Sequence, residues 1–176
     1  KVVGWEVFLG ESAANSRRVI ERAVLAENMV GQPLVLHADN GSPFKGVTLL
    51  EKLRDLQIQP SFSRPRVSNE ALFRTCKYVP NYPVSGFADL SAAQRWVHGF
   101  VQWYNYEHRH SAIRFVTPMQ RHTGEDKAIL AKRHALNLAA RAAHPERWSG
   151  DTRNWHPVTL VSLNPERRVV REVEKI

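Results

Sequence analysis

The chain has 176 residues, the size of one domain with a small appendage, and is long enough to bury a real core. Its 25 lysines and arginines oppose 17 aspartates and glutamates, and the formal net charge of +8 favours a polyanionic partner such as nucleic acid over an unrelated basic enzyme. A single cysteine excludes an internal disulfide and the paired ligands of a structural zinc site, and no apolar run is long enough to span a membrane.

The first part of the chain predicts alternating strands and helices. Residues 1–10 alternate and are rich in Val, Trp and Phe, which is typical of a strand. Ser12 can cap the helix that follows, and the apolar run over 34–36 predicts a buried central strand. A helix over 46–57 and a strand over 58–62 come next. This order is the signature of parallel βαβ units, so we expect an α/β fold with three strands in one sheet.

One carboxylate stands at the end of the central strand. Asp39 follows the apolar run and precedes Asn40-Gly41, a dipeptide that favours a tight turn. Open α/β sheets place their ligand sites at the carboxyl ends of their strands. An aspartate in this position can instead serve only to form the turn, and the residues alone leave both interpretations open.

A polar, basic loop over 63–69 follows the last of these strands. It carries Arg64 and Arg66, and Pro65 excludes a helix there. Arginines on a loop beside an acidic site are suited to phosphate contact. The alternative is a solvated loop with no ligand.

The next predicted helix, over 70–78, has a charged face. Glu70, Arg74 and Lys77 lie at spacings that place them on one side of the helix. This face is either a solvated surface with one ion pair or an acid flanked by cations that bind phosphate.

The remaining predicted elements are a long aromatic helix from Asp89 or Ser91, a helical turn from Pro118, a basic helix over 126–143, and short strands over 158–163 and 169–173. The aromatic side chains of the long helix fall at helical spacing, which predicts a core stripe, with base stacking as the alternative. The change of composition predicts a main domain over 1–122 and a helical and β extension over 123–176.

Several motifs stand in a fixed order along the chain. They are Lys1-Val2-Val3-Gly4-Trp5, His37-Ala38-Asp39-Asn40-Gly41-Ser42, Pro60-Ser61-Phe62-Ser63-Arg64, Glu70-Ala71-Leu72-Phe73-Arg74-Thr75, and Trp103-Tyr104-Asn105 with Arg109-His110 and Thr117-Pro118. In this order they resemble the catalytic core of bacterial insertion-sequence transposases, in the retroviral-integrase-like group (the DDE superfamily). The resemblance covers 1–122, and the tail is similar to a C-terminal extension found in one branch of that group.

The resemblance implies an RNase H-like mixed sheet flanked by helices, with a site of two aspartates and a glutamate. Asp39 matches the second acid and Glu70 the third, and the first acid is expected on a strand upstream of Lys1. Such acids hold Mg²⁺ or Mn²⁺, and two ions assist an in-line displacement at phosphorus. The candidates for contacts to DNA phosphates are Lys45, Arg64, Arg66, Arg74, Lys77 and Arg109.

The implied function is metal-dependent cleavage of transposon DNA ends and their joining to target DNA, by an oligomer of at least two copies. The implied location is the bacterial cytoplasm, at the nucleoid, without membrane association. The alternative is a DNA-binding or assembly module that derives from such an enzyme and has no catalysis. Only 30 residues separate Asp39 from Glu70. This spacing is shorter than is usual in the family, so we expect residues to be missing between Asn69 and Glu70, and before Lys1.

Overall fold

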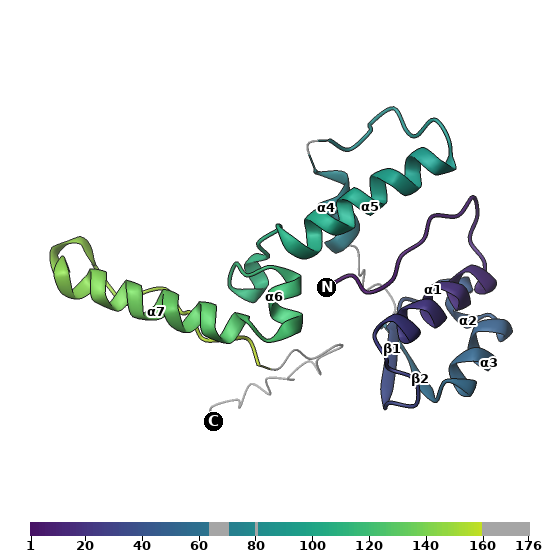
Figure 1. Ribbon diagram of the computed structural model, residues 1–176, viewed down its shortest axis with the longest axis horizontal. Helices are drawn as coiled ribbons and strands as arrows, with labels where there is room; N and C mark the ends of the chain where they lie inside the picture. The colour runs from purple at the N-terminus through teal and green to yellow at the C-terminus, as the bar shows by residue number, and fades with distance from the viewer. Residues whose placement is uncertain (64–70, 80, 160–176) are drawn as a thin grey trace, which may run out of the picture.

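The computed structural model describes residues 1–63, 71–79 and 81–159 (Figure 1). Within these residues the chain forms seven α-helices, two short 3₁₀ helices and a two-stranded sheet, so the predicted α/β class is confirmed. The helices are α1 (Ala13–Ala26), α2 (Ser42–Lys45), α3 (Val47–Asp55), α4 (Ala71–Lys77), α5 (Leu90–Tyr106), α6 (Pro118–Thr123) and α7 (Asp126–Ala143). The strands are β1 (Leu34–Ala38) and β2 (Ile58–Phe62), and the 3₁₀ helices are η1 (Ser111–Ile113) and η2 (Pro145–Arg147).

The two strands are parallel, and α2 and α3 connect them. Their register runs from Leu34 opposite Ile58 to Ala38 opposite Phe62, so both strands end at the same edge of the sheet. The predicted central strand, the strand over 58–62 and the helix between them are confirmed, although α2 is an additional short helix that the sequence pattern did not reveal.

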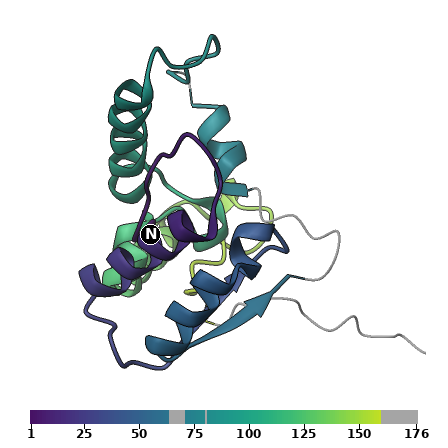
Figure 2. The same ribbon diagram turned by 90° about the vertical axis from the view of Figure 1, so that its right-hand side faces the viewer.

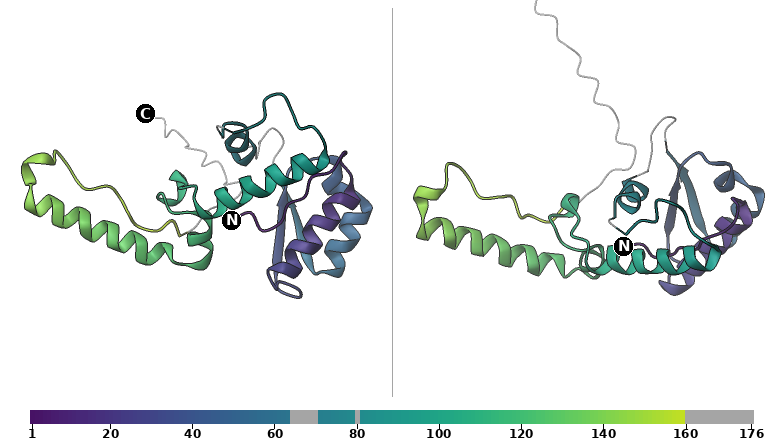
Figure 3. Two further views of the ribbon diagram at one scale, coloured as in Figure 1. Left: turned by 45° about the horizontal axis from the view of Figure 1, so that its top comes forward. Right: turned by 90° about the horizontal axis from the view of Figure 1, so that it is seen from above.

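The main core lies on one face of this sheet, against α1 and α3 (Figure 3). Its buried centre consists of Val24, Leu49, Leu53 and Ile58. Side chains alternate between the faces of a strand, so Leu34 and Leu36 point to this core and Val35 between them points to the other face.

The predicted strand over residues 1–10 is wrong. The segment lies as an extended stretch beside α1 (Figure 2), and Lys1 pairs with Glu27 at 2.8 Å. The Asn105 side chain accepts from the Val2 N–H at 2.8 Å and donates to the Val2 carbonyl oxygen at 3.0 Å. A side chain of α5 therefore takes the place of a neighbouring strand. The sheet has two strands among the described residues, where three were expected.

The α5 helix begins at its first possible cap. Asp89 accepts from the Ala92 N–H at 2.6 Å, so the cap is Asp89 and not Ser91. The predicted aromatic stripe is part of the core at Phe100, which is buried and stacks on Trp96 with 5.7 Å between ring centroids. The predicted start of α6 at Pro118 is also confirmed, since Thr117 closes a capping box there.

The α7 helix projects from the rest of the molecule (Figure 1), and the chain after it runs back along the helix. Arg133 lies over the Trp155 ring at 5.4 Å, and Arg121 donates to the carbonyl oxygen of Val158. The predicted strand over 158–163 is absent at Val158 and Thr159; its remainder, and the predicted strand over 169–173, lie outside the described residues. Over the described part of the chain, the structure contains no helix with the length and apolar character that crossing a membrane requires.

Candidate active site

Asp39 stands directly after β1, at the edge where both strands end. Its Oδ1 atom accepts from the Gly41 N–H at 2.9 Å, so Asp39 does form the turn, as one of its two interpretations predicted. The side chain is exposed, and Oδ2 makes no hydrogen bond to any described residue. One oxygen is therefore held by the backbone and the other is available to a ligand.

A polar network beside Asp39 joins the ends of the two strands. The His37 ring lies between two hydroxyls, with Nδ1 at 3.0 Å from Ser61 Oγ and Nε2 at 3.2 Å from Ser63 Oγ. Asn40 donates from Nδ2 to the Ser63 carbonyl oxygen at 2.7 Å, and the Ser63 N–H donates to the Ala38 carbonyl oxygen at 2.8 Å. We call His37, Asn40, Ser61 and Ser63 the strand-end network. It fixes the backbone on both sides of the Asp39 turn.

Sequence reasoning missed this network, although a signal for it existed. His37 and Asp39 are two residues apart, as are Ser61 and Ser63, so each pair shares one face of its strand. The parallel register places His37 opposite Ser61. Polar residues repeating with period two at the ends of adjacent strands predict such a cluster, once the pairing of the strands is assumed.

Lys45 is the predicted phosphate contact that lies at the same sheet edge. Its Nζ atom lies 5.8 Å from the centre of the Phe62 ring, and Phe62 is the last residue of β2. The ammonium group is exposed and stands close to where the strands end. This position suits an anion that approaches Asp39.

The other predicted phosphate contacts among the described residues lie on elements other than the sheet. Arg74 and Lys77 are both exposed on α4, and Arg109 is exposed in the chain between α5 and η1. No contact among the described residues joins Arg109 to the Asp39 turn. Glu70, Arg64 and Arg66 lie outside the described residues, as does the link between Asn69 and Glu70.

The donor set for a divalent cation is only partly described. An exposed carboxylate with one unbonded oxygen is a suitable ligand for Mg²⁺ or Mn²⁺. Over residues 1–63, 71–79 and 81–159, however, no three His, Cys, Asp or Glu side chains come together. Asp39 therefore suits one position of the expected site, and Glu70, the other expected ligand in this chain, lies outside the described residues.

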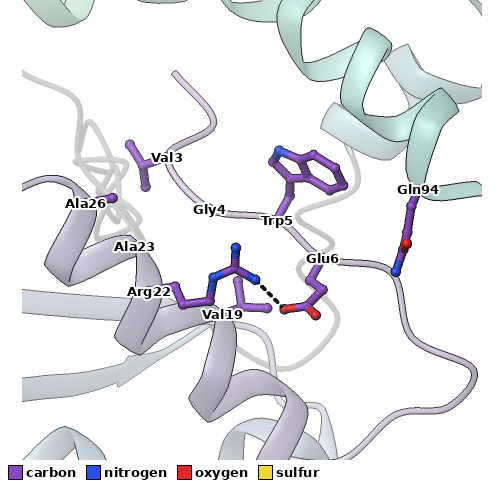
Figure 4. A pocket seen from close by; sticks show the side chains of 9 residues that line it. All are labelled: Val3, Gly4, Trp5, Glu6, Val19, Arg22, Ala23, Ala26 and Gln94. Carbon is purple, nitrogen blue, oxygen red and sulfur yellow. Dashed lines mark hydrogen bonds and ion pairs between the residues drawn. The ribbon is translucent and has the colours of Figure 1, made fainter. Parts of the chain in front are cut away.

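Two cavities lie elsewhere. One of about 400 Å³ is lined by the N-terminal segment, α1 and Gln94 of α5, and Glu6 pairs with Arg22 at 3.1 Å within its lining (Figure 4). The other, of about 520 Å³, is mostly apolar and runs beside β1. Asp39 and the residues of the strand-end network line neither of them.

Comparisons with protein families, with curated proteins and with solved structures find no match to this chain.

Proposed function

We propose that this protein is a DNA transposase of the RNase H-like, DDE type, which cleaves transposon ends and joins them to target DNA. The observation that carries the proposal is the position of Asp39. It is an exposed carboxylate at the shared carboxyl edge of a parallel sheet, with one oxygen held by Gly41 and the other unbonded among the described residues. The ordered motifs of the sequence and the net charge of +8 support the same proposal.

Each side chain has a defined task in the proposed reaction. Asp39 and Glu70 hold the cation, together with a first acid expected upstream of Lys1. When bound, two Mg²⁺ or Mn²⁺ ions would activate the attacking oxygen and stabilise the leaving oxygen. Cations position the DNA strand through its phosphates without reading its sequence. Those proposed here are Lys45, Arg64, Arg66, Arg74, Lys77 and Arg109.

The proposal extends to the organisation of the protein. Residues 1–122 form the RNase H-like domain, and 123–176 form an extension to it. At least two copies act together, because two DNA ends are joined, and the protein works on DNA at the bacterial nucleoid. The second candidate function is a DNA-binding or assembly module without catalysis. It is favoured by the basic charge and by the exposed α4 cations, which need no metal to act.

Asp39→Asn in the complete protein separates the two functions. The substrates are duplex oligonucleotides made from the DNA on either side of the protein's own gene, incubated with Mg²⁺ or Mn²⁺. The amide keeps the shape of the side chain but loses the charge that the metal needs. We therefore expect cleavage and joining to fall at least about a hundredfold, while DNA affinity stays within about threefold.

Asp55→Asn is the matched control, because Asp55 is an exposed aspartate at the end of α3. It should leave both activity and DNA affinity unchanged. Joining by the Asp39→Asn protein within about tenfold of the unmodified protein would remove Asp39 from the metal site. Metal-independent DNA binding without any cleavage by the unmodified protein would favour the non-catalytic module.

A further inference from the structure

The outer face of α4 combines aromatic rings with cations. Phe73 is 67% exposed and Tyr78 is 77% exposed, and the cations Arg74 and Lys77 are exposed between them. Two pairs stand four residues apart, Phe73 with Lys77 and Arg74 with Tyr78, so each pair follows one line along the helix. Exposed apolar side chains that gather on one face often mark an interaction site.

This face continues to Tyr78, just beyond the last residue of α4. The Tyr78 N–H donates to the carbonyl oxygens of Arg74 at 3.2 Å and Thr75 at 3.3 Å, so the turn of the helix persists there. The Arg74 guanidinium lies 5.8 Å from the centre of the Tyr78 ring. Five positions of a helix cover about 7.5 Å along its axis, so Phe73 and Tyr78 are far enough apart to contact separate bases.

The opposite side of α4 is less exposed. Its residues are the half-buried Leu72, Thr75, Cys76 and Val79. Burial raises the pKa of the Cys76 thiol. These side chains are less exposed than Phe73 and Tyr78, so the rings lie on the more accessible side of the helix.

We propose that this outer face, formed by Phe73, Arg74, Lys77 and Tyr78, binds unpaired bases of a DNA strand. Exposed rings between cations are the usual surface for single-stranded nucleic acid, since the rings stack on bases and the cations contact phosphates. A duplex presents its phosphates outward and keeps its base faces stacked, so it would use the cations but not the rings.

Charge selects DNA over an apolar protein partner. Neither Arg74 nor Lys77 forms an ion pair with any carboxylate of the described residues. An apolar surface packed on the rings would remove water from both cations without compensation, which is costly. DNA phosphates would instead pair with both cations and so offset their loss of water. The inference rests on the proposed function only in taking DNA as the ligand, and it requires neither metal nor catalysis.

The test measures anisotropy of a labelled oligo(dT) and of a labelled duplex, both in EDTA. Phe73→Leu and Tyr78→Leu keep apolar bulk but remove the ring, and Tyr78→Phe is the matched control that keeps it. Stacking is worth about 1–3 kcal/mol per base, so each leucine variant should weaken oligo(dT) binding about five- to a hundredfold. Duplex binding should stay within about twofold, and Tyr78→Phe should bind like the unmodified protein.

Arg74→Ala and Lys77→Ala complete the test. They should weaken both DNA forms, and each should reduce the slope of log affinity against log salt, by about 0.9 on the duplex and about 0.7 on the single strand. Equal losses on both DNA forms in the leucine variants would overturn the inference, as would unchanged oligo(dT) binding in them or no oligo(dT) binding by the unmodified protein. None of these outcomes bears on Asp39, because cleavage is measured separately on duplex ends with metal present.

Discussion

Gly41→Ala should separate the proposed DNA-joining activity from the stability of this protein. A methyl group on Gly41 would lie 2.9 Å from Asp39 Oδ1, whereas an ordinary contact is at least 3.4 Å. The carboxylate must therefore retreat by about 0.5 Å, and it loses its hydrogen bond from the Gly41 N–H. The next nearest group outside Asp39, Pro43 Cδ, lies at an ordinary 3.6 Å, so Asp39 takes most of the displacement.

The expected change in stability is small because two terms oppose each other. Gly41 has φ −58° and ψ 144°, a conformation that alanine adopts without strain. Alanine then gains about 0.4–1 kcal/mol by restricting the unfolded chain. Loss of one exposed hydrogen bond costs about 0.5–1.5 kcal/mol, so the free energy of unfolding should change by less than about 1 kcal/mol.

The expected change in activity is larger. Misplacing a catalytic group by about 1 Å can cost about a hundredfold, so a shift of about half that size should reduce DNA joining at least about tenfold. The assays are strand joining with metal and urea denaturation of the same preparations. Gly99→Ala is the control, because no atom lies within 4 Å of its added methyl group in α5. It should gain up to about 1 kcal/mol of stability and keep full activity.

Two results would refute this reasoning. Joining by Gly41→Ala within about twofold of the unmodified protein would show that the Gly41 contact does not orient a functional carboxylate. A loss of more than about 2 kcal/mol in the free energy of unfolding would show that the turn itself is strained by the methyl group.

Two further predictions concern the ion pair between α6 and α7 and the histidine that follows α5. Arg121→Met should lower the free energy of unfolding, measured in urea, by about 3–5 kcal/mol, because Asp126 is 2% exposed and would lose its ion-pair partner at 2.5 Å. The double variant Arg121→Met/Asp126→Leu should recover most of this loss, because it also removes the buried charge. Equal losses in the single and double variants would contradict this explanation. Burial, and to a lesser extent the nearby charge of His110, lowers the pKa of His108 from its ordinary 6.5. Between the folded pKa and about 6.5 the unfolded chain therefore binds more protons than the folded one. Stability should rise with pH over this range and level off above it. His108→Gln should remove that contribution from the pH dependence of the urea midpoint, and an unchanged profile would contradict it.

Local sequence patterns predicted the elements whose ends are determined by neighbouring residues. Ser12 caps α1, Thr117 caps α6, and the Asp39 carboxylate accepts from the Gly41 N–H after β1, and each of these contacts spans only two or three residues. The short α2 was missed because four residues after a turn carry too little periodicity to reveal a helix.

Contacts between distant residues depend on how the strands pair and where the helices lie, which local sequence patterns do not determine by themselves. The alternation over residues 1–10 indicates a segment that can be extended, but whether it becomes a strand depends on an available sheet edge. Here the Asn105 amide, from the far end of α5, binds both backbone groups of Val2 instead. The strand-end network has the same origin, since the contacts of His37 with Ser61 and Ser63 depend on the register of β1 and β2.

The alternation of β1 also explains why the site and the core can vary independently. Leu34 and Leu36 face the core against α1 and α3, whereas His37 and Asp39 belong to the opposite face. A polar substitution at Asp39 therefore removes no apolar contact from the core, and its stability cost is limited to an exposed turn. The main constraint on the site comes from hydrogen bonds at the ends of the strands, which orient the carboxylate without burying it. A carboxylate oriented by the backbone and still exposed to water is what a metal ligand for DNA chemistry requires, because the substrate is too large to enter an enclosed pocket.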